Sequence, residues 1–216
     1  PQGLPKRIEE GMKYKVVIVG ACPAGSFTAL ELKRQGYSGS IALIDKGRAI
    51  ENRHCPKDKT QKCVNCKPYC HITTGFSGAG AFSDGKLSLS YEVGGDLPEL
   101  ICPRQARALI DYTASVYLDF GAAPAVEGLG NTAKVKDIRK RAIQAGLKLV
   151  DCPIRHLGTE KAQDIYKSIQ DFLADNGVEM RFGTECTDLV LENGVCRGVL
   201  ARDVKSGENF AVQAHA

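Results

Sequence analysis

One run of ten residues predicts the architecture of this chain: Val16-Val17-Ile18-Val19-Gly20-Ala21-Cys22-Pro23-Ala24-Gly25. Its apolar, β-branched part extends back to Tyr14 and predicts a buried strand from Tyr14 to Val19. Gly20 ends the strand, and the residues from Ala24 to Gln35 have the apolar spacing of a helix. The chain is therefore expected to turn sharply between a strand and a helix.

A second strand follows this helix and completes a folding unit. Gly36 ends the helix, and Ser40 to Ile44 is an apolar run that leads into Asp45. Two strands joined through a helix are normally parallel and form a right-handed crossover. The first 45 residues thus predict the beginning of an α/β, Rossmann-like fold with a parallel sheet.

The turn between strand and helix matches the dinucleotide-binding fingerprint G-x-G-x-x-G at two of its three glycines. In that fingerprint the first glycine makes the turn, the second lets the backbone approach a pyrophosphate, and the third allows close packing of helix on strand. Gly20 and Gly25 supply the first and the third. Cys22 stands in place of the second, and a side chain there costs about 1 kcal/mol if the position requires a positive φ.

The surroundings of the turn favour a nucleotide site. The beginning of a helix presents N–H groups and the positive end of its dipole to a phosphate. Asp45 lies 20 residues beyond Gly25, at the end of the second strand, where a carboxylate can accept both hydroxyls of an unphosphorylated adenosine ribose. The residues expected to hold the diphosphate are Gly20, Cys22, Pro23, Ala24 and Gly25.

The last part of the chain predicts a helix, a strand and a β meander. Thr159 to Asp175 repeats apolar residues at helical spacing, and Val178 to Phe182 reads as a third buried strand. The Asn193-Gly194 pair is a strong hairpin signal. The three short strands expected around it are Cys186 to Leu191, Val195 to Asp203 and about Asn209 to Gln213.

A longer motif in the middle of the chain carries a family resemblance. It reads Ile72-Thr73-Thr74-Gly75-Phe76-Ser77-Gly78-Ala79-Gly80-Ala81-Phe82-Ser83-Asp84-Gly85-Lys86-Leu87 and is followed by Glu92-Val93-Gly94-Gly95. Together with the cysteines before it and with Cys152-Pro153-Ile154-Arg155-His156-Leu157-Gly158-Thr159 after it, this pattern resembles a bacterial family of predicted FAD-dependent, NAD-utilizing dehydrogenases. The order of elements is also similar to the FAD-binding domains of the glutathione-reductase-like superfamily.

The resemblance covers about residues 12–212 and implies how the chain is organised. Members of the family are much longer, and the Ala-Thr-Gly-containing strand that follows the meander in the superfamily is absent here. We therefore expect an N-terminal fragment. Its FAD-binding domain would span 12–216 and be incomplete at the C-terminus, with an inserted Cys/Gly-rich loop and helical region at 46–158. Residues 1–11 would be a leader or an added remnant.

The glycine-rich motif is expected to lie near the flavin. Its glycines permit close approach of the backbone, whose N–H groups can bind a diphosphate or a ribityl chain. An acidic and a basic side chain next to them offer one acceptor and one donor. The residues concerned are Gly78, Gly80, Asp84, Gly85 and Lys86. Lys46, directly after Asp45, is expected beside the adenine.

Four cysteines fall within sixteen residues before this motif: Cys55, Cys63, Cys66 and Cys70. Their spacing, C-x7-C-x2-C-x3-C, leaves three interpretations open. Four thiolates can bind zinc or an iron–sulfur cluster. Alternatively, Cys63 and Cys66 form a redox dithiol that exchanges electrons with the flavin. The third interpretation is that these cysteines are structural and share no role.

Composition excludes several other classes of protein. The chain has 216 residues and a net charge of +4, with no concentrated run of Lys and Arg and few aromatic side chains, so we expect no nucleic-acid partner. No apolar run approaches the 18 or so residues of a membrane span, so we expect no membrane partner. The odd number of nine cysteines favours reduced thiols and a cytoplasmic location.

The functional hypothesis is an FAD-dependent oxidoreductase, in which the flavin takes electrons from NAD(P)H or from an unidentified small-molecule substrate. The alternative is a non-catalytic nucleotide- or metal-binding fragment of a longer flavoprotein. The sequence assigns no catalytic residue.

Overall fold

The computed structural model describes residues 12–130 and 132–215, so the expected leader at 1–11 lies outside the described residues. The chain divides into two compact units. The first contains the residues up to Phe82 and those from Tyr166 onward, and the second is Ser83–Ile165. Each unit is described by itself below.

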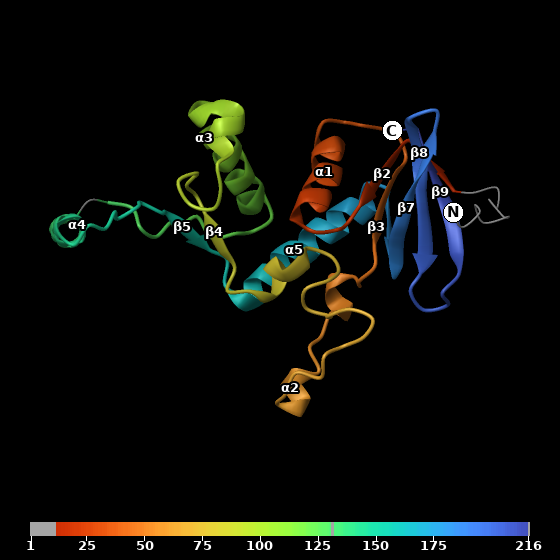
Figure 1. Ribbon diagram of the computed structural model, residues 1–216, viewed down its shortest axis with the longest axis horizontal. Helices are drawn as coiled ribbons and strands as arrows, with labels where there is room; N and C mark the ends of the chain where they lie inside the picture. Colours follow the sequence, from red (N-terminus) through yellow and green to blue (C-terminus); the bar gives the residue numbers. More distant parts are fainter. Residues whose placement is uncertain (1–11, 131, 216) are drawn as a thin grey trace. The chain divides into compact units, whose positions relative to one another are not determined.

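The centre of the first unit is a three-stranded parallel sheet. It consists of β2 (Val16–Val19), β3 (Ile41–Asp45) and β6 (Val178–Phe182), in the order β2-β3-β6 (Figure 1). The first four residues of β3 are buried, as expected for the central strand of a parallel sheet. The predicted α/β fold with a parallel sheet is confirmed.

The predicted meander forms an antiparallel sheet beside it. Its strands are β7 (Thr184–Glu192), β8 (Val195–Asp203) and β9 (Asn209–Ala214). Asn193 and Gly194 both have positive φ, 51° and 78°, which suits a tight hairpin. The two-residue strand β1 (Lys13–Tyr14) pairs with β9 rather than with β3. The single strand predicted from Tyr14 to Val19 is therefore divided between two sheets.

A shared hydrophobic core joins the two sheets of the first unit. It consists of Tyr14, Ala42, Ile44, Val199, Ala201 and Val212. Two helices complete the unit: α1 (Pro23–Arg34) and the later part of α5 (Thr159–Asp175), whose bounds match the predicted helix. Both helices bury apolar side chains in the part of the chain that the structure describes, including Leu30 of α1 and Ile169 of α5.

The segment from Gly47 to Phe82 also belongs to the first unit. It contains η1 (Ile50–Asn52), α2 (Lys57–Thr60) and η2 (Gly78–Phe82), joined by irregular chain. Its backbone is hydrogen-bonded to the turn between β2 and α1, because Ser77 N–H donates to the Ala21 carbonyl at 2.7 Å. The compact second unit therefore begins at Ser83, whereas the inserted region was expected to begin at residue 46.

The second unit contains a short ribbon and two helices. The antiparallel ribbon is β4 (Lys86–Ser88) with β5 (Ile154–His156), and the helices are α3 (Leu97–Asp119) and α4 (Ala133–Gln144). The helical backbone of α3 is interrupted by a kink at Cys102, whose φ is 63°. The Thr132 side chain caps α4 by accepting a hydrogen bond from Val135 N–H at 3.3 Å.

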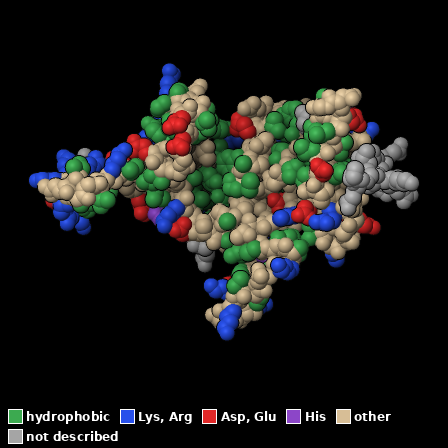
Figure 2. All heavy atoms as spheres, viewed as in Figure 1, with side chains coloured by type: hydrophobic (Ala, Val, Ile, Leu, Met, Phe, Trp, Pro, Cys, Tyr) green, Lys and Arg blue, Asp and Glu red, His purple; other side chains and the backbone are tan. Residues whose placement is uncertain are grey.

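Helix α4 concentrates positive charge. Its residues include Lys134, Lys136, Arg139, Lys140 and Arg141, and none of its residues is buried. Figure 2 shows these basic side chains gathered over the helix. The expectation of no concentrated run of Lys and Arg is therefore wrong for this helix. Among the described residues, no helix has both the length and the apolar character required to cross a membrane.

Replacing Gly25 with alanine tests the close packing of α1 on the sheet. A Cβ on Gly25 would collide with the Gly20 carbonyl and lie 3.2 Å from Ile18 Cγ2. Gly25→Ala should lower the free energy of unfolding by about 1–3 kcal/mol, the usual cost of overpacking. Urea unfolding followed by circular dichroism measures the change. Ala24→Ser, at the exposed neighbouring position, is the matched control, and equal unfolding free energies for the two variants would contradict the prediction.

Candidate functional site

The turn between β2 and α1 has the geometry that its glycines predict. Gly20 has a φ of +95°, in the region that favours glycine, and its N–H donates to the Ile44 carbonyl at 2.7 Å. Gly25 leaves room for the Gly20 carbonyl, as shown by the collision that a Cβ would cause. The turn is thus fixed tightly against the carboxyl end of the parallel sheet, where open α/β sheets bind ligands.

Cys22 sits in this turn without backbone strain. Its φ is −66° and its ψ 174°, an extended conformation open to any residue. The cost of about 1 kcal/mol expected for a residue with positive φ does not arise here. The side chain is exposed and forms no capping hydrogen bond to the helix. Cys22 therefore affects a ligand only through the volume of its side chain.

The N-terminus of α1 is suited to an anion. The helix begins at Pro23 and Ala24, its first turn contains no acidic residue, and Lys33 and Arg34 occupy its last turn. The first N–H groups of a helix have no intrahelical partners, and the helix dipole favours negative charge at this end. An anion at the turn would be held by backbone groups.

Asp45 connects the end of β3 to this turn. Its Oδ2 accepts a hydrogen bond from Ala21 N–H at 2.9 Å, and its Oδ1 accepts one from Gly47 N–H at 2.6 Å. A carboxylate has about four acceptor sites, so both oxygens can still accept from a ligand hydroxyl. Asp45 is half-buried and lies at the position expected for a ribose-binding acid.

Lys46, the next residue, points to the meander. Its Nζ lies 3.8 Å from Glu185 Oε1, and the side chain is 46% exposed. Glu185 also pairs with Arg202 at 2.7 Å. The hydrogen bond from Arg202, and then its charge and that of Lys46, lower the pKa of Glu185. Lys46 is therefore part of an exposed charge network near the end of the sheet.

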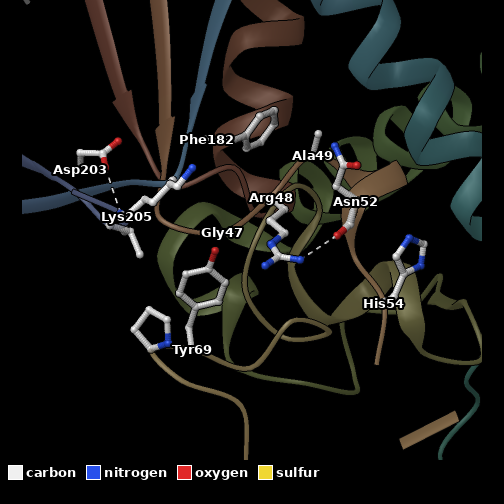
Figure 3. Close-up of a pocket in the computed structure, with 12 residues that line it drawn as sticks. Gly47, Arg48, Ala49, Asn52, His54, Tyr69, Phe182, Asp203 and Lys205 are labelled. Atoms are coloured by element: carbon white, nitrogen blue, oxygen red, sulfur yellow. Dashed lines mark hydrogen bonds between the residues drawn. The ribbon is translucent and has the colours of Figure 1, made fainter. Parts of the chain in front are cut away.

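A cavity of about 770 Å³ opens beside Gly47 (Figure 3), whose N–H donates to Asp45. Four parts of the first unit form its walls: the chain after β3, the end of β6 with Gly183, the Pro68–Tyr69 stretch, and the end of β8 with the turn that follows it. Its residues include Gly47, Arg48, Asn52, Tyr69, Phe182 and Gly183. Its lining mixes aromatic and apolar side chains with charged and polar ones, including Asp203 and Lys205, and its volume lies within the usual range of small-molecule sites.

The structure divides the predicted glycine-rich motif between the two units. Gly78 lies beside the turn, since a Cβ on it would be 3.6 Å from Cys22 Cβ and 3.8 Å from Pro23 Cδ. Gly80 lies near α5, because its Cβ would be 3.5 Å from the Tyr166 hydroxyl oxygen. Both belong to the first unit. The structure thus brings Gly78 and the turn together, as a shared ligand site requires.

Asp84, Gly85 and Lys86 belong to the second unit. Asp84 Oδ2 and Lys86 Nζ form an exposed ion pair at 2.6 Å. Its hydrogen bond lowers the pKa of Asp84 and raises that of Lys86. Gly85 accepts a hydrogen bond at its carbonyl from Leu157 N–H at 2.8 Å. These contacts give all three residues a role in the local fold of the second unit. Their part in flavin binding stays a prediction.

The four clustered cysteines do not form a metal centre in the structure. Cys55, Cys63, Cys66 and Cys70 line a pocket of about 60 Å³ together with His71. Within the described residues, however, no three His, Cys, Asp or Glu side chains are placed to hold a metal ion. The zinc and iron–sulfur interpretation therefore gains no support from the structure. All four thiols are free.

Sequence reasoning did not identify Arg53 or Gln170. Arg53 is 1% exposed and Gln170 5%. Gln170 of α5 accepts a hydrogen bond from Ile50 N–H at 3.0 Å and donates one to Glu51 at 2.9 Å. Arg53 follows directly after these residues. The only sequence signal is a charged residue in a stretch without periodicity, which does not distinguish a buried arginine from a surface one.

Comparisons with known proteins test the predicted fold and family. No family model matches the chain. An uncharacterized protein of Clostridium beijerinckii is 25% identical over 205 residues, which are 95% of this chain and 30% of that protein. The chain thus spans less than a third of the length of this relative.

Three solved structures share the fold at low sequence identity. They are a 3-ketosteroid-delta4-(5alpha)-dehydrogenase from Rhodococcus jostii RHA1 in complex with 4-androstene-3,17-dione (TM-score 0.55, 15% identity), the Mycobacterium smegmatis Sdh1 complex (0.52, 15%) and a flavocytochrome c3 fumarate reductase (0.51, 14%). The matches cover 94%, 95% and 94% of this chain, but 44%, 33% and 32% of those chains. They confirm the α/β fold, and the chain corresponds to less than half of each structure.

The thiol of Cys70 should react faster than other exposed thiols of its loop. Hydrogen bonds from Ile72 N–H and from the Thr73 side chain lower the pKa of Cys70, so more of it is thiolate at neutral pH. Alkylation by iodoacetamide at pH 7, followed by peptide mass spectrometry, should label Cys70 before the exposed Cys63. Thr73→Ala should slow Cys70 and leave Cys63 unchanged. Equal rates for the two cysteines in the unmodified chain would contradict this.

Proposed function

We propose that this chain is the FAD-binding part of an FAD-dependent oxidoreductase. The observation that supports this most strongly is the turn after β2. It combines Gly20 at positive φ, a Gly25 without room for a Cβ, the open N-terminus of α1 and a carboxylate from Asp45. This combination fits the adenosine diphosphate half of a dinucleotide. Two of the solved structures that share the fold are those of a dehydrogenase and a flavocytochrome fumarate reductase.

Different residues of the first unit would bind different parts of FAD. The backbone from Gly20 to Gly25 would hold the diphosphate, and Asp45 would accept from the adenosine ribose. The cavity beside Gly47, with Tyr69 and Phe182 in its walls, would take the adenine, with Lys46 at its edge. Gly78, beside Cys22 and Pro23, would let the backbone approach the same ligand.

FAD, when bound, would supply the electron- and hydride-accepting chemistry. The protein's residues would bind and orient it. The electron donor would be a small molecule, either NAD(P)H, as the sequence resemblance implies, or a reduced organic substrate. The Asp45 position favours an unphosphorylated adenosine ribose in the turn itself. With FAD in that turn, NAD(P)H would bind elsewhere in the whole protein.

A second candidate follows from the length of the chain. It covers 30% of its Clostridium beijerinckii relative and 44% or less of the three structures. A fragment of this size could bind the nucleotide without catalysing a reaction. An anaerobic absorption spectrum after incubation with FAD, followed by addition of NADH, separates an NADH-dependent oxidoreductase from the binding fragment. Bound flavin that NADH bleaches supports the oxidoreductase, and bound flavin that NADH leaves oxidised supports the binding fragment or an oxidoreductase with another electron donor.

Substitution of Asp45 tests the proposed ligand. Asp45→Asn keeps the size of the side chain but loses the charge, and should weaken FAD binding about 10-fold, because hydrogen bonds to charged groups are worth about 1.5–3 kcal/mol. Asp45→Ala should weaken it further, since it loses the bonds from both Ala21 N–H and Gly47 N–H, whereas the single amide oxygen of Asn can still accept one of them. Equilibrium dialysis with FAD measures the affinity, and circular dichroism checks folding.

FMN is the matched ligand control because it lacks the adenosine half of FAD. The unmodified chain should bind FMN more weakly than FAD, and Asp45→Asn should leave FMN binding unchanged. An equal loss of FAD and FMN affinity would mean that Asp45 acts on the fold rather than on the ribose. Lack of FAD binding by the unmodified, folded protein would overturn the proposed function.

A further inference from the structure

Arg53 is a buried cation that forms no ion pair with a carboxylate of the described residues. Its side chain is 1% exposed, and among the residues that the structure describes it forms no ion pair. Burial lowers the pKa of Arg53 to about 10, against the opposing charges of Asp45 and Cys70, so the guanidinium is still charged at neutral pH. Buried charges are normally paired, because an unpaired charge is costly to desolvate. This arginine therefore requires an explanation.

Its hydrogen bonds all go to one segment of the chain. Nε donates to the His71 carbonyl at 3.0 Å, and Nη1 donates to the Phe76 carbonyl. The guanidinium also lies over the ring of Phe82, with Cζ 4.6 Å from the ring centroid. Nη2 has no hydrogen-bond partner within the described residues. Arg53 thus contacts both ends and the middle of the segment 71–82, and its Nη2 donates no hydrogen bond within the described residues.

The same segment forms one wall of the turn. Phe76 N–H donates to the Arg48 carbonyl at 3.0 Å, and Ser77 N–H donates to the Ala21 carbonyl at 2.7 Å. Ser77 has a φ of 65°, which is unfavourable for a residue other than glycine. Its hydroxyl is buried and has no hydrogen-bond partner in the described part of the chain. A strained residue and two unsatisfied polar groups therefore accompany the contact between segment 71–82 and the turn.

We propose that Arg53 is a positioning residue that holds segment 71–82 against the β2–α1 turn and makes this turn selective for phosphate-bearing ligands. The inference rests on the proposed function, in which the diphosphate of FAD occupies the turn. Arg53 forms no ion pair within the described residues, and interactions of buried charges are screened little by salt. A phosphate group at the turn would add negative charge to that of Asp45, which acts on Arg53 without forming an ion pair with it among the described residues. Asp45 itself accepts hydrogen bonds from Ala21 N–H and Gly47 N–H.

A purely mechanical role makes a different prediction. If Arg53 only joins two carbonyls to an aromatic ring, its loss should disturb the turn for every ligand alike. If its charge matters, the loss should depend on the phosphate groups of the ligand. ADP and adenosine differ only in the diphosphate, so they are suitable probes for this distinction.

The test compares ADP and adenosine binding by calorimetry to the unmodified protein, Arg53→Met and Arg53→Lys. We expect Arg53→Met to weaken ADP at least about 10-fold and adenosine less than about 2-fold, and Arg53→Lys to keep ADP affinity within about 3-fold. Arg197→Met, at an exposed site on β8, removes one positive charge elsewhere and should change neither ligand. Equal losses of ADP and adenosine in Arg53→Met, or no loss of either, would overturn the proposal.

A measurement on the unmodified protein covers the case in which the Arg53 variants do not fold. Hydrogen exchange followed by mass spectrometry should show that ADP slows exchange in segment 71–82 and that adenosine does not. Equal protection by the two ligands, or protection by neither, would overturn the role of Arg53. If the folded, unmodified protein bound neither FAD nor ADP, the proposed function would fail together with this inference, whereas FAD binding with unchanged Arg53→Met affinity would overturn this inference alone.

Discussion

The close contact between Gly25 of α1 and the carbonyl of Gly20 at the end of β2 is the constraint on which the first unit depends. No larger residue fits at Gly25, so α1 begins directly above the sheet and its N–H groups face the carboxyl ends of the strands. Asp45 secures the same point from the neighbouring strand by bonding to Ala21 N–H and Gly47 N–H. The positions of the turn, of β3 and of the chain that leaves β3 are therefore set by a few backbone contacts.

This dependence explains which parts of the fold could be predicted from the sequence. The strand–helix–strand unit, α5 and the meander each have a local signal: a β-branched run, a helical repeat or an Asn-Gly turn. Their bounds agree closely with the structure, and α5 agrees at both ends. The division of the predicted first strand at Lys15 could not be seen, because it depends on the pairing of β1 with β9, more than 190 residues later in the chain.

The segment between Gly47 and Phe82 has no local sequence signal of this kind. It has little regular structure, and individual hydrogen bonds tie it to the rest of the first unit, from Ser77 N–H to the Ala21 carbonyl, from Gly183 N–H to the Gly47 carbonyl and from Ile50 N–H to the Gln170 side chain. Glycine spacing predicted that this segment approaches a ligand, which stays a prediction, and the structure places Gly78 beside the turn. The same spacing could not show that Asp84 and Lys86 belong to another compact unit, or that the four cysteines are not arranged as a metal site among the described residues.

Charge and backbone geometry at the turn support each other. An open helix N-terminus attracts an anion through partial charges, which are effective only over a short range. A buried guanidinium that forms no ion pair within the described residues adds a full charge, and it is anchored to the segment that contacts Ala21. Replacing the second glycine of the fingerprint by Cys22, in an extended conformation, leaves both contributions intact. In the proposed site, the departure from the fingerprint would thus change the shape of the turn's surface and leave the proposed attraction for a phosphate intact.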